Sequence, residues 1–180
     1  MSDPGWADAI SAHAAEQGSA GRLIAGLVTL EREALSFCRL LERWARGDAE
    51  PATPDGRRAA LQEAAEKVEA ALEGVESPLS RYLLELEPER AEGSSWFGEP
   101  GQAELVDWEP VLSRAGVQAE PHRVAAAYLE LAVLIRALEG LSAAVGFEAS
   151  PDRGSLWAGL FDLRENLLGR AQDDLRALAA

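Results

Sequence analysis

Residues 120–147 read EPHRVAAAYLELAVLIRALEGLSAAVGF, and this stretch decides the fold class. Its apolar side chains recur in alternating steps of four and three, the spacing of one face of an α-helix. These positions are Val124, Tyr128, Leu131, Ile135 and Leu138. Apolar side chains also occupy most of the remaining circumference, so we predict a central helix surrounded by other helices. The stretch is too short and too interrupted to span a bilayer, which takes roughly 20 mainly apolar residues.

A second helix of equal regularity is predicted over residues 19–46. A strict alternation of four and three runs through Leu23, Leu27, Leu30, Ala34, Phe37, Leu41 and Trp44. We expect this helix and the one at 120–147 to form the core pair, with Gly26 allowing a neighbouring helix to approach closely. The clean repeat also leaves open that its apolar seam pairs with a second copy of the chain, as a homodimer.

The rest of the chain reads as shorter or more polar helices. Helices are predicted at residues 55–74, 77–88, 102–114 and 150–172, with a weakly ordered N-terminal helix within 1–18. The break before residue 77 is predicted from Ser77-Pro78, a cap followed by proline. Residues 88–101 are expected to form a loop, and residues 173–180 to fray. Since no segment alternates like a strand, we predict one all-α domain over residues 1–180, a bundle of about six to seven helices.

The chain carries a net charge of −14, from 31 acidic and 17 basic residues. An acidic surface repels a phosphate backbone, and we find no local basic stripe in the sequence, so we expect no nucleic-acid partner. A basic peptide or a basic protein face would be attracted instead. A surface that only keeps the protein soluble would carry the same charge. Because the N-terminus lacks the pattern of a signal peptide, we expect a cytoplasmic protein.

Residues able to carry metal or nucleophilic chemistry are sparse. His13 and His122 are the only histidines, and neither forms the Glu-x-x-His motif of a diiron bundle. Cys38, the only cysteine, lies on the apolar side of its helix, where we expect a small buried side chain. No glycine-rich phosphate loop is present. We therefore predict no catalytic residue, no metal and no cofactor, and expect a protein that is not an enzyme.

Three side chains stand out from this background. Glu130 has only apolar neighbours three and four residues away along the predicted helix, and burying an unpaired carboxylate is costly. We expect an arginine from another helix to anchor it, or else a role as a polar contact inside a peptide-binding groove. Trp96 and Phe97 are adjacent aromatics in the predicted loop. They either pack back onto the bundle or form a contact surface.

The order of features from Gly98 to Leu163 resembles the redox-enzyme maturation chaperones, the all-helical family that assembles nitrate reductase and related molybdenum enzymes. Three pieces carry the resemblance. They are GQAELVDW (residues 101–108) with the helix end at Ala115-Gly116-Val117, Glu120-Pro121 ahead of Tyr128-Leu129-Glu130-Leu131, and Arg153-Gly154-Ser155 with Leu160-Phe161-Asp162. One departure is His122-Arg123-Val124, where many relatives carry an aspartate after the proline.

The resemblance implies a chaperone without chemistry of its own, which holds the basic N-terminal peptide of an apo-redox enzyme until the metal cofactors are loaded. Such a peptide would lie in an apolar groove edged by carboxylates. The candidate partner-binding residues are Trp96, Phe97, Glu120, His122, Arg123, Tyr128 and Glu130.

Two other functions stay open. An acidic immunity or inhibitor protein that masks a basic partner would need only charge and small size. A small-ligand-binding helical bundle would use Glu130 as the polar group of a pocket between helices.

Overall fold

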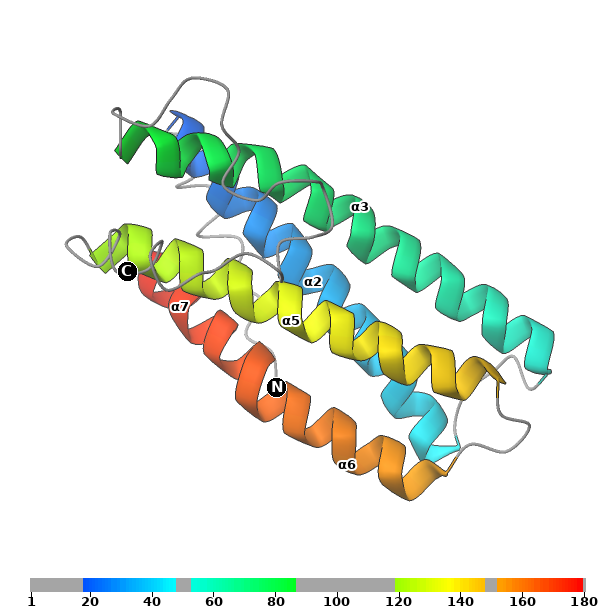
Figure 1. Cartoon of the computed structure of the whole chain (residues 1–180). Helices are drawn as coiled ribbons and strands as arrows, with labels where there is room; N and C mark the ends of the chain where they lie inside the picture. Colours follow the sequence, from blue (N-terminus) through cyan, green and yellow to red (C-terminus); the bar gives the residue numbers. More distant parts are fainter. Residues whose placement is uncertain (1–17, 48–52, 87–118, 148–151, 180) are drawn as a thin grey trace.

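The computed structural model describes residues 18–47, 53–86, 119–147 and 152–179. The helices are α2 (Gly18–Arg46), α3 (Pro54–Leu86), α5 (Ala119–Phe147), α6 (Arg153–Leu163), the π-helical turn η2 (Arg164–Leu168) and α7 (Gly169–Ala179). The last three form one continuous rod (Figure 1). No strand occurs among the described residues, and the predicted all-α fold is confirmed there.

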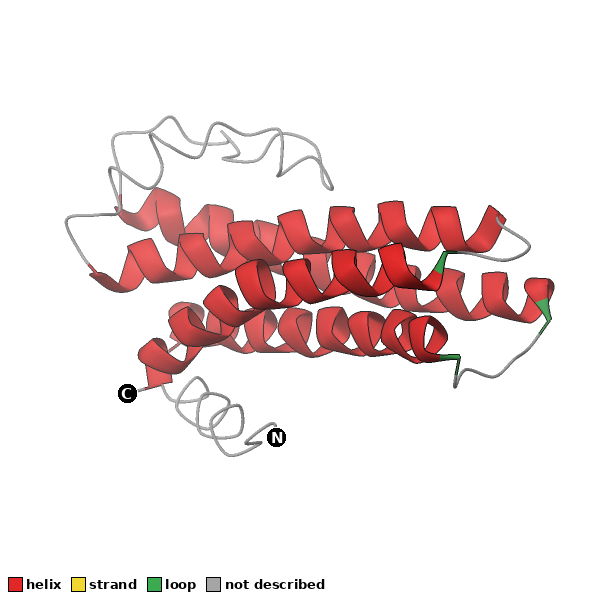
Figure 2. Cartoon of the chain, turned by 90° about the horizontal axis from the view of Figure 1, so that it is seen from below, coloured by secondary structure: helices red, strands yellow, loops and turns green. Residues whose placement is uncertain are grey.

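The four rods form an up-down-up-down bundle, in which each rod runs antiparallel to the one before it (Figures 1 and 2). Around the bundle, α2 packs on α3, α3 on α5, α5 on α7, and α6 on α2. The diagonal helices α2 and α5 also contact each other across the centre. The expected core pair is therefore present, as the diagonal of a four-helix bundle.

The two predicted apolar stripes form the core of this bundle. On α2, every member of the stripe from Leu23 to Trp44 is buried, and on α5 so is every member from Val124 to Leu138. The α2 seam is thus occupied by α3, α5 and α6 of the same chain and is not left open for a second copy. Gly26 meets α3 at Val75, whose Cγ2 lies 3.1 Å from where a Cβ would stand.

Helix α3 differs from the prediction, since it runs unbroken from residue 54 to residue 86 with Pro78 in its interior. The predicted break before Ser77 is wrong. The buried face continues in steps of four and three through Leu72, Val75 and Leu79, across the position of the proline. Burial of this face stabilises the helix more than the hydrogen bond lost at Pro78 destabilises it.

The helix count follows from this merger. The described residues form four helical rods, and the count of six to seven helices predicted for the whole chain is not confirmed. The helices predicted within 1–18 and at 102–114, and the loop predicted at 88–101, lie outside the described residues.

The C-terminal rod begins at Arg153 and ends at Ala179, whereas the sequence predicts a helix over residues 150–172. Asp152 caps its start, accepting hydrogen bonds from the backbone of Gly154 at 3.1 Å and the hydroxyl of Ser155 at 2.6 Å. The predicted fraying from residue 173 is wrong, because helix continues to residue 179. Ala171 and Leu175 are fully buried, and this burial holds the last turns in place.

A π-helical turn interrupts the rod at residues 164–168. The N–H of Gly169 donates to the carbonyl of Arg164, five residues earlier, so this turn holds one residue more than an α-helical turn. The register of the buried face shifts accordingly, and Leu168, rather than Leu167, takes the fully buried position. Before this turn the rod packs mainly on α2, and after it mainly on α5.

Candidate functional site

The most unusual carboxylate of the described residues is Glu130, on the side of α5 that faces α7. Its Oε2 atom is buried and accepts no hydrogen bond from the described residues. Burial raises the pKa of Glu130 to about 7, and the carboxylates of Asp174 and Asp173 add to this effect, while Arg170 opposes it. The arginine anchor expected from the sequence is therefore missing as a hydrogen-bond partner.

The arginine on the same face of α5 as Glu130 is already engaged. Arg123, seven residues before Glu130, donates to Asp174 of α7 at 3.0 Å. This ion pair is partly exposed and contributes little to stability by itself. Arg123 is therefore paired with Asp174 and not with Glu130. Asp173 and Asp174 of α7 lie close enough to Glu130 to raise its pKa.

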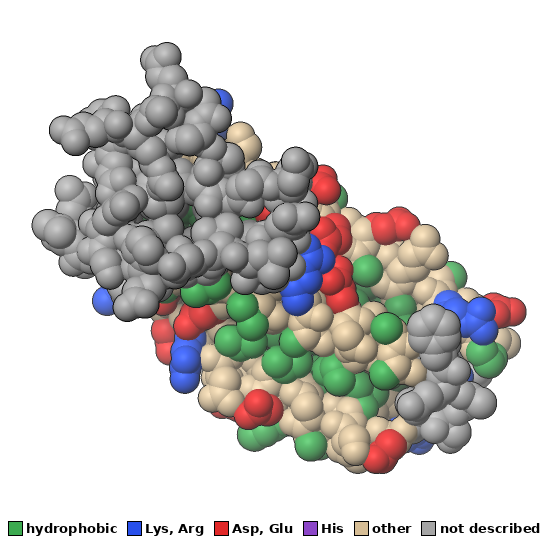
Figure 3. Space-filling model, viewed as in Figure 1, with side chains coloured by type: hydrophobic (Ala, Val, Ile, Leu, Met, Phe, Trp, Pro, Cys, Tyr) green, Lys and Arg blue, Asp and Glu red, His purple; other side chains and the backbone are tan. Residues whose placement is uncertain are grey.

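An uncharged strip flanks Glu130 on the outside of the bundle. We define the α5 outer face as the residues spaced by three or four along the solvent side of α5, Ala126, Leu129, Val133, Ala137 and Gly140. All five are half-buried or exposed, and Val133 is 39% exposed. Figure 3 shows hydrophobic side chains gathered on the side of the bundle where α5 lies in front. A half-buried carboxylate thus sits at the edge of an apolar surface.

Two further glutamates are buried more deeply than Glu130. Glu31 of α2 is 2% exposed and accepts a hydrogen bond from Gln172 of α7. Burial raises its pKa, and the hydrogen bond from Gln172 and nearby arginines oppose this. Glu76 of α3 is 6% exposed and accepts a hydrogen bond from Tyr128 of α5 at 3.2 Å. Unlike Glu130, both glutamates are satisfied, so they serve as structural cross-links.

Sequence reasoning missed both of these residues. The neighbours of Glu31 at three and four residues are all apolar, as they are around Glu130, so the same test would have found it. Glu76 has Leu72 and Leu79 on one side and polar residues on the other, which gives a weaker signal.

The predicted partner-binding residues do not form one site. Glu130 and Arg123 both face α7, whereas Tyr128 is fully buried and has no surface to offer a partner. Trp96 and Phe97 lie outside the described residues. The side chains of Glu120 and His122, in the first turn of α5, also lie outside them.

Reactive chemistry has little support in the described part of the chain. Cys38 is 1% exposed, as expected, and burial raises the pKa of its thiol to about 12, which makes it a poor nucleophile. No group of three or more His, Cys, Asp or Glu side chains there is arranged to hold a metal ion. Among the same residues, no helix combines the length and the apolar character needed to cross a membrane.

Comparisons of the chain with protein families, with characterised proteins and with solved structures found no match. The assignment of function therefore depends on the geometry of the chain itself.

Proposed function

We propose that this protein is a non-catalytic helical adaptor or chaperone that binds a basic segment of a client protein. Glu130 and the α5 outer face form the binding site in this proposal. The observation that carries it is the buried Oε2 of Glu130, which lacks a donor among the described residues and lies at the edge of an exposed apolar strip.

A cationic side chain of the client would supply the hydrogen-bond donor that Glu130 lacks among the described residues. A guanidinium or ammonium group would donate a charge-assisted hydrogen bond to the accessible side of the half-buried Glu130 carboxylate, and such a bond is stronger than a neutral hydrogen bond. Asp173 and Asp174 are already paired with Arg176 and Arg123, so Glu130 is the carboxylate left to bind that cation. Binding thus relieves an unfavourable arrangement of the free protein.

The apolar part of the client segment fits the neighbouring strip. An amphipathic segment could place small apolar side chains on Ala126, Val133 and Ala137 while one basic side chain reaches Glu130. The net charge of −14 steers a cationic segment toward the protein and makes its association sensitive to salt.

The client proposed from the resemblance is the N-terminal peptide of an apo-redox enzyme that acquires a molybdenum cofactor. The order of the three sequence pieces between Gly98 and Leu163 supports this choice. A basic toxin or other basic protein masked by this chain is the alternative client, and it would use the same carboxylates.

A fluorescence anisotropy titration tests the site. The probe is a labelled, acetylated peptide of alternating arginine and leucine clusters, and the variant is Glu130→Gln. We expect saturable binding that weakens with salt, and an affinity at least fivefold lower in the variant. Glu73→Gln is the matched control, since Glu73 is an exposed glutamate of α3 and the charge change is the same. An equal loss in both variants, or no saturable binding to wild type, would refute the site.

A second titration addresses the client. N-terminal peptides of apo-molybdenum enzymes are compared with composition-matched scrambled peptides. Tighter binding of the native order supports the chaperone, while equal affinity rejects the molybdenum-enzyme client and retains recognition of basic segments.

A further inference from the structure

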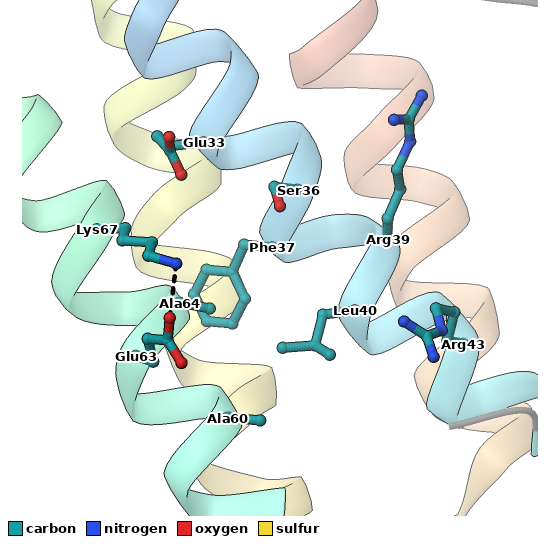
Figure 4. A pocket seen from close by; sticks show the side chains of 10 residues that line it. All are labelled: Glu33, Ser36, Phe37, Arg39, Leu40, Arg43, Ala60, Glu63, Ala64 and Lys67. Carbon is teal, nitrogen blue, oxygen red and sulfur yellow. Dashed lines mark hydrogen bonds and ion pairs between the residues drawn. The ribbon is translucent and has the colours of Figure 1, made fainter. Parts of the chain in front are cut away.

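A second surface feature lies away from Glu130, in a groove between α2 and α3. Its volume is about 410 Å³. The groove is lined from α2 by Glu33, Ser36, Phe37, Arg39, Leu40 and Arg43, and from α3 by Ala60, Glu63, Ala64 and Lys67 (Figure 4). A groove of this size falls in the range of sites that hold small organic ligands.

The groove exists because the α3 wall is built from small side chains. Ala60 and Ala64 lie one turn apart on α3 and face Phe37 and Leu40 of α2 (Figure 4). Phe37 is fully buried and forms the floor, while Leu40 is half-buried at the side. These four side chains make the apolar part of the groove, which Glu33 and Glu63 also line.

The charges at one end of the groove favour an anion. At the other end, Lys67 pairs with Glu63 at 2.7 Å and Glu33 lies nearby, so that end carries no excess of positive charge. Arg43, by contrast, makes no hydrogen bond or ion pair with the described residues, and Figure 4 shows it beside Leu40. Arg39 lies one turn before it. A cationic end is thus joined to an apolar channel.

This end of the groove belongs to a wider basic stripe. Four exposed arginines follow one face of α2 in steps of seven, four and three, at Arg32, Arg39, Arg43 and Arg46. The stripe is not apparent in the linear sequence, because acidic residues lie between its members along the chain. In a protein of net charge −14, it is a local excess of positive charge.

We propose that the α2–α3 groove binds a small amphiphilic carboxylate. The apolar tail lies between the alanines of α3 and the floor of Phe37 and Leu40, and the carboxylate head is bound by Arg43. A guanidinium can hold a carboxylate through two parallel hydrogen bonds. The lining from Glu33 to Arg43 spans about 15 Å of helix, enough for an extended alkyl chain.

A small ligand suits this site better than a polyanion does. A single carboxylate feels mainly the arginines within a Debye length of about 10 Å, whereas an extended nucleic acid would meet the acidic remainder of the surface. The site is separate from Glu130, so its failure would not affect the proposed function.

Isothermal titration calorimetry with decanoate, decanol and acetate tests the proposal. We expect saturable binding of decanoate, at least tenfold weaker binding of decanol, and none of acetate. Arg43→Gln should weaken decanoate binding at least fivefold and leave decanol binding unchanged. Ala64→Leu fills the channel with a helix-forming residue and should weaken the binding of both decanoate and decanol. Ala60→Leu fills the channel at a second position and should have the same effect.

The matched control is Arg58→Gln, an exposed arginine of α3 whose partner within the described part of the chain is Asp55, outside the groove. It should change decanoate affinity less than twofold. Equal affinity for decanol and decanoate, or full binding by both filled variants with native circular dichroism, would overturn the proposal. A glutamate–leucine peptide that binds at the groove while decanoate does not would also reject the small ligand in favour of an acidic protein segment.

Discussion

The amide nitrogen of Gln172 in α7 lies 2.6 Å from a carboxylate oxygen of Glu31 in α2. The two residues are 141 positions apart, and their hydrogen bond joins the first and last described helices inside the bundle. Because Glu31 is almost fully buried, its partner cannot be replaced readily by water.

Replacing Gln172 by leucine is therefore expected to destabilise the protein. The loss leaves a buried acceptor unsatisfied, which costs about 1–3 kcal/mol in the free energy of unfolding. The double variant Glu31→Leu/Gln172→Leu should recover most of that loss, because neither polar group remains. Urea denaturation measures both values. Gln62→Leu, which removes the exposed bond to Glu66, is the control and should cost less than about 0.5 kcal/mol.

The titration of Glu130 predicts how stability depends on pH. Its pKa is raised from 4.5 to about 7 in the folded protein, so the folded state retains a proton that the unfolded state has lost between these values. Stability should fall as pH rises from 4.5 to 7 and then level off. Glu130→Gln removes this contribution, so the variant should be more stable than wild type by about 1 kcal/mol at pH 8, after allowance for solvent screening.

Thermal unfolding at pH 5 and pH 8 checks this difference. Glu31 also has a raised pKa, but it contributes equally to both proteins and cancels in the comparison. A variant whose advantage is the same at both pH values would show that Glu130 does not titrate as described.

The same carboxyl group predicts the pH dependence of client binding. A cation binds the ionised form, so the affinity for the arginine–leucine peptide should rise about tenfold from pH 6 to pH 8. Arginine does not titrate in this range, so the peptide itself contributes no change. Anisotropy titrations at several pH values measure the effect, and a flat profile in wild type, or a sloping one in Glu130→Gln, contradicts it.

Two glycines should respond in opposite ways to alanine. Gly47 ends α2 with a φ of +84°, a conformation that alanine adopts only with strain, so Gly47→Ala should destabilise by about 1 kcal/mol. Gly140 lies inside α5 with open space around it, so Gly140→Ala should stabilise by about 0.5–1 kcal/mol. Paired urea titrations compare the two, and a common sign would show that this backbone assignment is wrong.

The core of the fold was predictable from residue spacing. The stripes beginning at Leu23 and Val124 each bury every member, because a repeat of four and three must face other helices to remove its apolar surface from water. The same pattern crosses Pro78, but the local signal of a serine followed by proline favoured a break. The helix continues through Pro78 because Val75 and Leu79 are buried against other helices. Local residue preferences carry no information about that tertiary burial.

The site was predictable in part. The apolar neighbours of Glu130 in the sequence predict a carboxylate in apolar surroundings. In the structure, its Oε2 atom is buried and lacks a hydrogen-bond donor among the described residues. Its missing partner could not be foreseen, because the π-helical turn sets which side chains of α7 face α5. Nothing in the sequence of residues 164–168 distinguishes this turn from an ordinary α-helical one.

That turn also limits how the C-terminal rod can change. If residues 164–168 adopted an ordinary α-helical turn with the sequence unchanged, everything after them would rotate by about 100°. Gln172 would then lose its hydrogen bond to Glu31, and Asp174 would lose its ion pair with Arg123. Leu156 and Leu160, which precede the turn, would stay buried. Deleting one residue within residues 164–168 should instead be tolerated, because the shortened turn would be α-helical and would leave the following residues on their partners. The geometry of the turn, rather than the identity of its residues, keeps Gln172 on Glu31.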